Sequence, residues 1–151
     1  MEQNFEISAD VMDVIDSICE EGNTPEEKEC VKGYLLDVIT DACGLINIDY
    51  HDTYGLFWGG GRVRAFEVAT AADDEHRMKH VVEQIGHKCA QISSFGKIML
   101  YLKCCDKNML KMDEMNALND WLSELDNEIN VVWGFSKNCD PDYLRAIVLV
   151  Q

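Results

Sequence analysis

An amide and two carboxylates lie within six residues near the middle of the chain. Asn47, Asp49 and Asp52 follow the spacing Asn-x-Asp-x-x-Asp. Two carboxylates three residues apart can polarise a water molecule or bind a cation. The alternative is an ordinary polar loop that accepts hydrogen bonds from backbone N–H groups at a helix end, and spacing alone favours it. A loop that meets another molecule would instead keep its carboxylates exposed and unpaired within the chain.

Two histidines four residues apart are the candidate metal ligands. His76 and His80 face one side of a predicted helix, with Asp73 one turn upstream. This spacing suits zinc, but the sequence specifies no third ligand and lacks the His-Glu-x-x-His pattern. Exposed helix positions explain the pair better. We therefore expect no metal and no cofactor, and His76 and His80 remain the candidates if a metal binds.

Three consecutive glycines, Gly59 to Gly61, invite comparison with a phosphate-binding loop. No Lys-Ser or Lys-Thr follows them, and no helix is expected to start there. The glycines are therefore interpreted as a turn. Without a phosphate loop, we expect that the chain is not an enzyme by itself.

The composition is that of one soluble domain with a strong negative charge. Of 151 residues, 28 are acidic and 13 are basic, which gives a net charge of -15. This charge argues against a nucleic acid or an anionic membrane as partner. No apolar run reaches the ~20 residues that span a bilayer, and the acidic N-terminus is unlike a signal peptide. We therefore expect a cytoplasmic protein, whose seven cysteines are free thiols.

Apolar periodicity predicts an α/β domain in which helices pack on a mixed sheet of four to five strands, preceded by two N-terminal helices. The predicted helices cover residues 11–18, 25–43, 72–87 and 113–125, and the predicted strands cover 53–58, 62–68, 97–102, 130–135 and 143–150, with a loop over 45–52. Gly44 is expected to end the second helix. Residues 72–75, of which 73–75 are acidic, are expected to open the third.

Strand pairing and core contacts are also predicted. Strands 53–58 and 62–68 are expected to form a hairpin around the glycines or to be joined there by a flexible loop, and the last two strands to close the chain around the turn at 138–141. Leu100 and Leu102 are expected to be buried against Trp121 and Leu125.

The residues around the Asn-x-Asp-x-x-Asp segment resemble a known family. The stretch Asp37-Val-Ile-Thr40, followed by Gly44-Leu-Ile-Asn-Ile-Asp-Tyr-His-Asp52, is similar to the end of the core helix and the synergy loop of FtsZ, the tubulin-like division GTPase. Weaker similarities continue at residues 73–77, 110–114 and 138–142. The resemblance covers residues 25–151, as an FtsZ C-terminal-like domain, and leaves residues 1–24 as an N-terminal helical extension.

The resemblance implies a partner and roles for the segment. In FtsZ this loop reaches the nucleotide of the neighbouring subunit. Carried over, Asp49 and Asp52 are acids that act only in trans, and Asn47 and His51 join them in binding the partner. The partner is then FtsZ, another tubulin-like GTPase, or a second copy of this chain.

The GTP-binding half of the family is absent from the sequence, and His51 adds a titratable group to the loop. Because positioning of the phosphate supplies most of the rate in such enzymes, the prediction is a non-catalytic regulator or cap of tubulin-like filaments. The alternatives are a homo-oligomeric scaffold that kept the fold alone, and a metal-binding or trans-acting GTPase-activating subunit.

Overall fold

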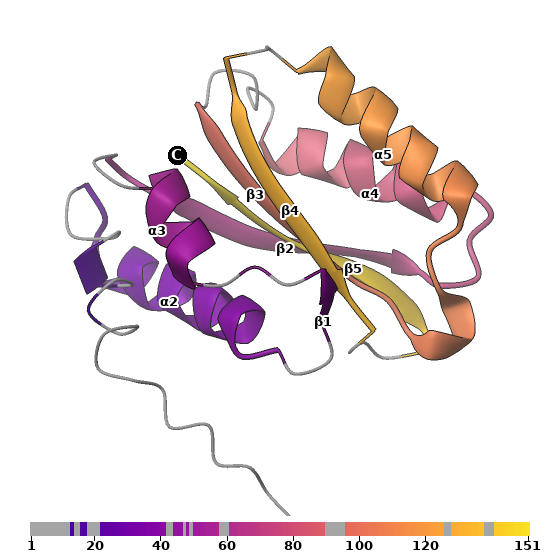
Figure 1. Cartoon of the computed structure of the whole chain (residues 1–151), viewed down its shortest axis with the longest axis horizontal. Coiled ribbons are helices and arrows are strands. Elements are labelled where there is room, and N and C mark those ends of the chain that lie inside the picture. The colour runs from indigo at the N-terminus through magenta and orange to yellow at the C-terminus, as the bar shows by residue number, and fades with distance from the viewer. Residues whose placement is uncertain are drawn as a thin grey trace, which may run out of the picture.

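The chain folds around one five-stranded sheet with helices on both faces (Figure 1). The structure, a computed structural model, describes residues 13, 16–17, 22–41, 44–46, 48, 50–57, 61–89, 96–125, 128–137 and 141–151. The strands are β1 Gly44–Ile46, β2 Arg64–Ala71, β3 Lys97–Lys103, β4 Asn130–Ser136 and β5 Tyr143–Val150. Their order across the sheet is β1-β4-β3-β5-β2. The β3–β4 pair is parallel and the other pairs are antiparallel, so the prediction of a mixed sheet is confirmed.

The helices divide between the two faces of the sheet (Figure 1). They are α2 Pro25–Ile39, α3 Tyr50–Phe57, α4 Arg77–Lys88 and α5 Met112–Glu124, with a short 3₁₀ turn, η2, at Asp106–Asn108. Helices α2 and α3 cover one face, called here the loop face, and α4 and α5 cover the other, called here the clamp face. Each face buries its own hydrophobic core. None of the helices in the described part of the chain is long and apolar enough to cross a membrane.

The predicted packing on the clamp face is confirmed, but full burial is found only for the two strand residues, since Trp121 and Leu125 are partly buried. Leu100 and Leu102 of β3 are fully buried, and Trp121 and Leu125, in and directly after α5, pack against the same cluster. Alternate residues of a strand point to opposite faces. The intervening Met99 and Tyr101 accordingly belong to the core of the loop face.

Helix α2 begins as the sequence predicts but ends earlier. Thr24 accepts a hydrogen bond from the Glu27 N–H, the Glu27 carboxylate accepts one from the Thr24 N–H, and Pro25 takes the first helical position. The helix stops at Ile39, not near Gly44, with Thr40 as its C-cap, whose N–H and hydroxyl both donate to the Leu36 carbonyl. Gly44 instead opens β1.

The predicted strand over 53–58 is wrong, and so is the predicted hairpin with 62–68. Residues Tyr50–Phe57 form helix α3. Thr53, Leu56 and Phe57 are buried, and their spacing of three and four residues is helical. β2 pairs with β5, while residues 58–60, including Gly59 and Gly60, lie outside the described part. The predicted loop over 45–52 likewise contains the end of β1 and the start of α3.

Two further predictions about connections are corrected. Helix α4 begins at Arg77 instead of at residues 72–75, because the Asp74 carboxylate accepts the His76 N–H and holds this stretch as a turn. The last two strands do not pair with each other, since β3 lies between β4 and β5. A closing hairpin at the end of the chain is therefore wrong.

The N-terminal extension falls largely outside the described residues. Of the predicted helix 11–18, only Asp13, Asp16 and Ser17 are described, and all three are helical. The Asp16 carboxylate lies 3.7 Å from Lys28 Nζ on α2. The boundary between residues 24 and 25 remains a prediction.

Candidate partner-binding surface

The Asn47–Asp52 segment connects the edge strand β1 to helix α3. Ile48 in its middle is buried, with 1% of its surface exposed, and Asp52 is exposed in the first turn of α3. Asn47 and Asp49 lie outside the described residues, as does the side chain of His51, whose backbone is helical. The exposure of Asp52 agrees with a partner-facing role. Asp52 also has an interaction within the chain.

Two large apolar side chains are exposed directly before this segment. Leu45 and Ile46 of β1 expose 47% and 41% of their surface. The pairing of β1 with β4 shifts between Gly44 and Ile46, so that two steps along β1 match one step along β4. Such a bulge bends the strand and redirects its side chains. The sequence analysis missed these residues, because a strand of three residues is too short for alternation to be visible.

Beyond the bulge, the chain passes over β4 at Gly134. A Cβ atom added there would lie 2.4 Å from the Ile46 carbonyl oxygen, 3.1 Å from Ile48 Cγ1 and 3.3 Å from Tyr101 Cδ2. Glycine inside a strand commonly marks such an approach of another backbone. The contact brings the chain from the sheet edge onto the loop face, where Ile48 joins the core.

Helices α2 and α3 fix both ends of the segment. Thr53, Leu56 and Phe57 bury one side of α3. Before the segment, the Asp41 carboxylate accepts a 2.9 Å hydrogen bond from the Tyr101 hydroxyl, and Tyr101 is itself fully buried. Leu45 and Ile46 before the segment and Asp52 at its end are therefore exposed, while Ile48 between them is buried.

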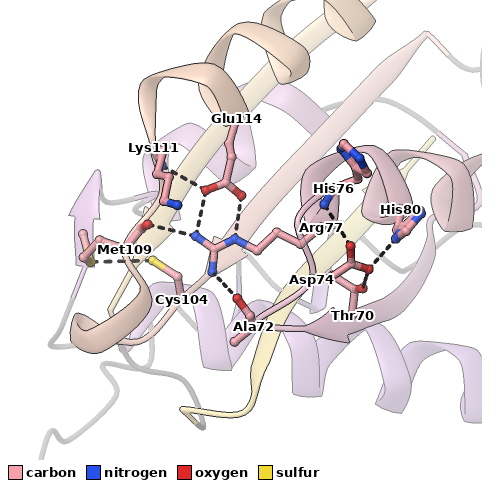
Figure 2. Close-up of polar contacts among 10 residues, drawn as sticks. All are labelled: Thr70, Ala72, Asp74, His76, Arg77, His80, Cys104, Met109, Lys111 and Glu114. Carbon is pink, nitrogen blue, oxygen red and sulfur yellow. Dashed lines mark hydrogen bonds and ion pairs between the residues drawn. The ribbon is translucent and has the colours of Figure 1, made fainter.

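The candidate metal pair is organised by Asp74, not by Asp73. The Asp74 carboxylate lies 2.5 Å from His80 Nδ1 and accepts the His76 N–H at 2.8 Å (Figure 2). The His76 N–H and the His80 ring hold the pKa of Asp74 below its usual range. Among the described residues, no three His, Cys, Asp or Glu side chains are placed to share a metal ion.

Sequence reasoning missed the main buried polar group, the Arg77–Glu114 pair. Arg77 is 5% exposed, and its Nε and Nη2 donate to the Glu114 carboxylate at 2.6 and 2.8 Å (Figure 2). Nη1 and Nη2 also donate to the carbonyls of Ala72 and Met109. Burial is the largest single influence and would raise the pKa of Glu114, but the hydrogen bonds from Arg77 and the Lys111 N–H, together with the charges of Arg77 and Lys111, lower the pKa overall. The two residues are 37 positions apart, so no local pattern indicates their contact.

A hollow of about 490 Å³ lies beside this pair, lined by acidic and basic side chains from the β2–α4 turn, η2 and the start of α5. Its central guanidinium is already satisfied by Glu114 and two carbonyls, which indicates a structural clamp joining α4 to α5. Nearby, burial raises the pKa of the Cys104 thiol, which disfavours the reactive thiolate. The described cysteines, Cys30, Cys89, Cys104 and Cys105, are all free.

Solved structures identify the fold, although no family model and no curated protein matches the sequence. An FtsZ dimer from M. jannaschii is 20% identical with a TM-score of 0.62, over 82% of this chain and 37% of its own. A variant FtsZ from M. jannaschii is 19% identical with a TM-score of 0.63, over 99% and 42%. A four-stranded filament of TubZ-Bt is 13% identical with a TM-score of 0.62, over 93% and 39%. The chain therefore has an FtsZ/tubulin-like fold and spans about two fifths of the length of these proteins.

Proposed function

We propose that this chain is a non-catalytic interaction module that binds a subunit of a tubulin-like filament and regulates or caps it. The binding surface is the Asn47–Asp52 segment together with Leu45 and Ile46. The observation that carries the proposal is the exposed apolar pair on the bulged edge strand, directly before a segment whose Ile48 is buried.

The proposed binding surface is held in place by buried neighbours and still exposes side chains to a partner. A segment already held by its buried neighbours loses less conformational freedom when a partner binds, so more of the contact energy appears as affinity. Leu45 and Ile46 supply apolar area, and the exposed Asp52 supplies a polar rim. This is the usual composition of a protein–protein interface.

The fold supports the choice of partner. Similar structures are an FtsZ dimer and a TubZ filament, and head-to-tail contacts between subunits generate filaments when they do not close into rings. A module that offers one half of such a contact would occupy a subunit's free surface and stop growth there. Within this proposal Asp49 and Asp52 approach the partner's nucleotide, and any catalytic role is exercised only in trans.

Capture of purified full-length FtsZ tests the proposal, in GTP and in GDP. We expect capture that depends on the nucleotide and is weakened at least tenfold by Ile46→Asp and by the double change Asp49→Asn with Asp52→Asn. Asp120→Asn, on the exposed side of α5, is the matched control and should bind as the parent does. All variants should keep their unfolding free energy within about 0.5 kcal/mol, as surface changes usually do.

Other outcomes separate the alternatives. Acceleration of GTP hydrolysis by the captured FtsZ would indicate a trans-acting activator, with Asp49 and Asp52 as its acids. A stable dimer in light scattering, disrupted by Ile46→Asp and accompanied by no capture, would indicate a homo-oligomeric scaffold. Capture that none of these substitutions weakens would contradict the proposed surface.

A further inference from the structure

Just before the proposed binding segment, the backbone at Ile46 lies directly against the backbone of β4 at Gly134, where no side chain separates them. We call Gly134, Tyr101 and Ile48 the crossing site. Gly134 does not adopt a positive φ, which among the described residues occurs only at Gly22. The requirement at Gly134 is therefore space and not backbone conformation.

The geometry shows how little space there is. A Cβ at Gly134 would approach the Ile46 carbonyl oxygen to 2.4 Å, and a backbone atom cannot rotate away as the end of a side chain can. Ile48 Cγ1 and Tyr101 Cδ2, at 3.1 and 3.3 Å, close the neighbouring directions, and both residues are fully packed in the core. The strain of an added methyl group would thus be relieved by moving β1 away from β4, which moves Leu45 and Ile46.

Tyr101 fixes the chain on the other side of β1. Its ring forms part of the crossing site, and its hydroxyl donates to Asp41 just after α2. One buried residue therefore positions both the approach to β1 and the point where the chain leaves it. β1 is also held by its short pairing with β4.

We infer that Gly134 and Tyr101 are positioning residues for partner recognition, setting the height and direction of Leu45 and Ile46 on β1 without touching the partner. This inference rests on the proposed function for the identity of the partner. The displacement of β1 can be tested without any partner.

The test compares Gly134→Ala with Gly86→Ala. Gly86 is an exposed position of α4 with nothing within 4 Å of an added Cβ, so it carries the same chemical change without the crowding. Amide hydrogen exchange of the peptide covering residues 44–48 reports the position of β1, and capture of purified FtsZ reports recognition. We expect Gly134→Ala to speed exchange there at least tenfold, to leave β5 unchanged and to weaken capture at least fivefold. Gly86→Ala should change neither.

Tyr101→Phe is the second variant, because it removes the hydroxyl bond to Asp41 and preserves the ring. We expect a smaller change of the same kind, two- to fivefold in exchange at 44–48 and in capture, with the far-ultraviolet circular dichroism of the parent. If Gly134→Ala fails to fold, this variant decides the question by the same two readouts.

The two readouts keep the failures distinct. Unchanged exchange at 44–48 overturns the inference whatever happens to capture. Faster exchange with undiminished capture also overturns it, because the position of β1 would then not matter to the partner. If the parent chain captures no FtsZ, the proposed function fails, and with it the recognition part of the inference, while exchange still decides whether Gly134 positions β1.

Discussion

Each face of the sheet buries a hydrophobic core, but the two faces differ in their polar contacts and in the side chains that they expose. On the clamp face, the apolar residues of β3 and β5 pack under α4 and α5, and the buried Arg77–Glu114 pair ties these two helices together. On the loop face, α2 and α3 cover the sheet, and between them the chain emerges at the edge with exposed Leu45 and Ile46. On this face, side-chain hydrogen bonds hold the chain just before and just after α2.

We interpret the clamp face as a structural scaffold and the loop face as the side that presents the proposed binding surface. The clamp is internal, because its charges are satisfied by each other and by two backbone carbonyls. The ties of the loop face, Tyr101 to Asp41 and Asn23 to Val63, each hold a segment that continues to the surface. Changes on the clamp face should therefore lower stability, whereas changes near β1 should alter recognition.

The largest loss of stability is expected for Arg77→Leu. This change leaves the Glu114 carboxylate and two carbonyls without their buried donor. Removing one partner of a buried pair costs about 3–5 kcal/mol, measured as the unfolding free energy in a urea titration. A loss below about 1 kcal/mol would show that the clamp is solvated and that the contrast between the faces is weaker than proposed.

Leu102→Ala should follow, with a loss of about 2–5 kcal/mol, because Leu102 is fully buried in the core of the clamp face. Denaturant titration measures it. Leu45→Ala, exposed at the sheet edge, is the control and should stay within about 0.5 kcal/mol of the parent. Equal losses for the two variants would contradict the assignment of β1 as a presenting edge.

A smaller effect is expected at the start of α2. Asn23 Nδ2 donates to the Val63 carbonyl at 2.8 Å, and the Val63 N–H donates back to Asn23 Oδ1 at 2.9 Å. Asn23→Ala removes both bonds from a half-buried site, which should cost about 1–3 kcal/mol. Faster hydrogen exchange at Val63, with unchanged exchange in β3, would show that the loss of stability is confined to the loop face. Faster exchange throughout the sheet would instead show that the two faces unfold as one unit.

The smallest effect is the acid sensitivity of the clamp. Because the folded pKa of Glu114 lies below its unfolded value, its stabilisation is present above that unfolded value, near pH 4, and is lost as the pH falls through the lowered pKa. Glu114→Gln should therefore be less stable than the parent at pH 7, with the difference shrinking below about pH 4. Thermal unfolding of both proteins from pH 7 to pH 3 measures it, and a constant difference would contradict the ion-pair account.

Local pattern alone determined the long elements. The apolar runs at β3 and β5 and the helical spacing of α5 lie close to where they were predicted, because the apolar pattern reflects burial. The Asn47–Asp52 segment was also visible as an acidic stretch after a helix. These features depend only on residues near each other in the chain.

Tertiary contacts decided the rest. Residues 53–57 are rich in aromatic and β-forming residues, yet they belong to helix α3 because Thr53, Leu56 and Phe57 share one buried side against the sheet. The Arg77–Glu114 clamp joins positions 37 apart, and the sequence shows Gly134 as a glycine in a strand without showing that Ile46 lies against it. Such contacts arise only when distant segments pack, since no periodicity within one segment records which atoms another segment will bring.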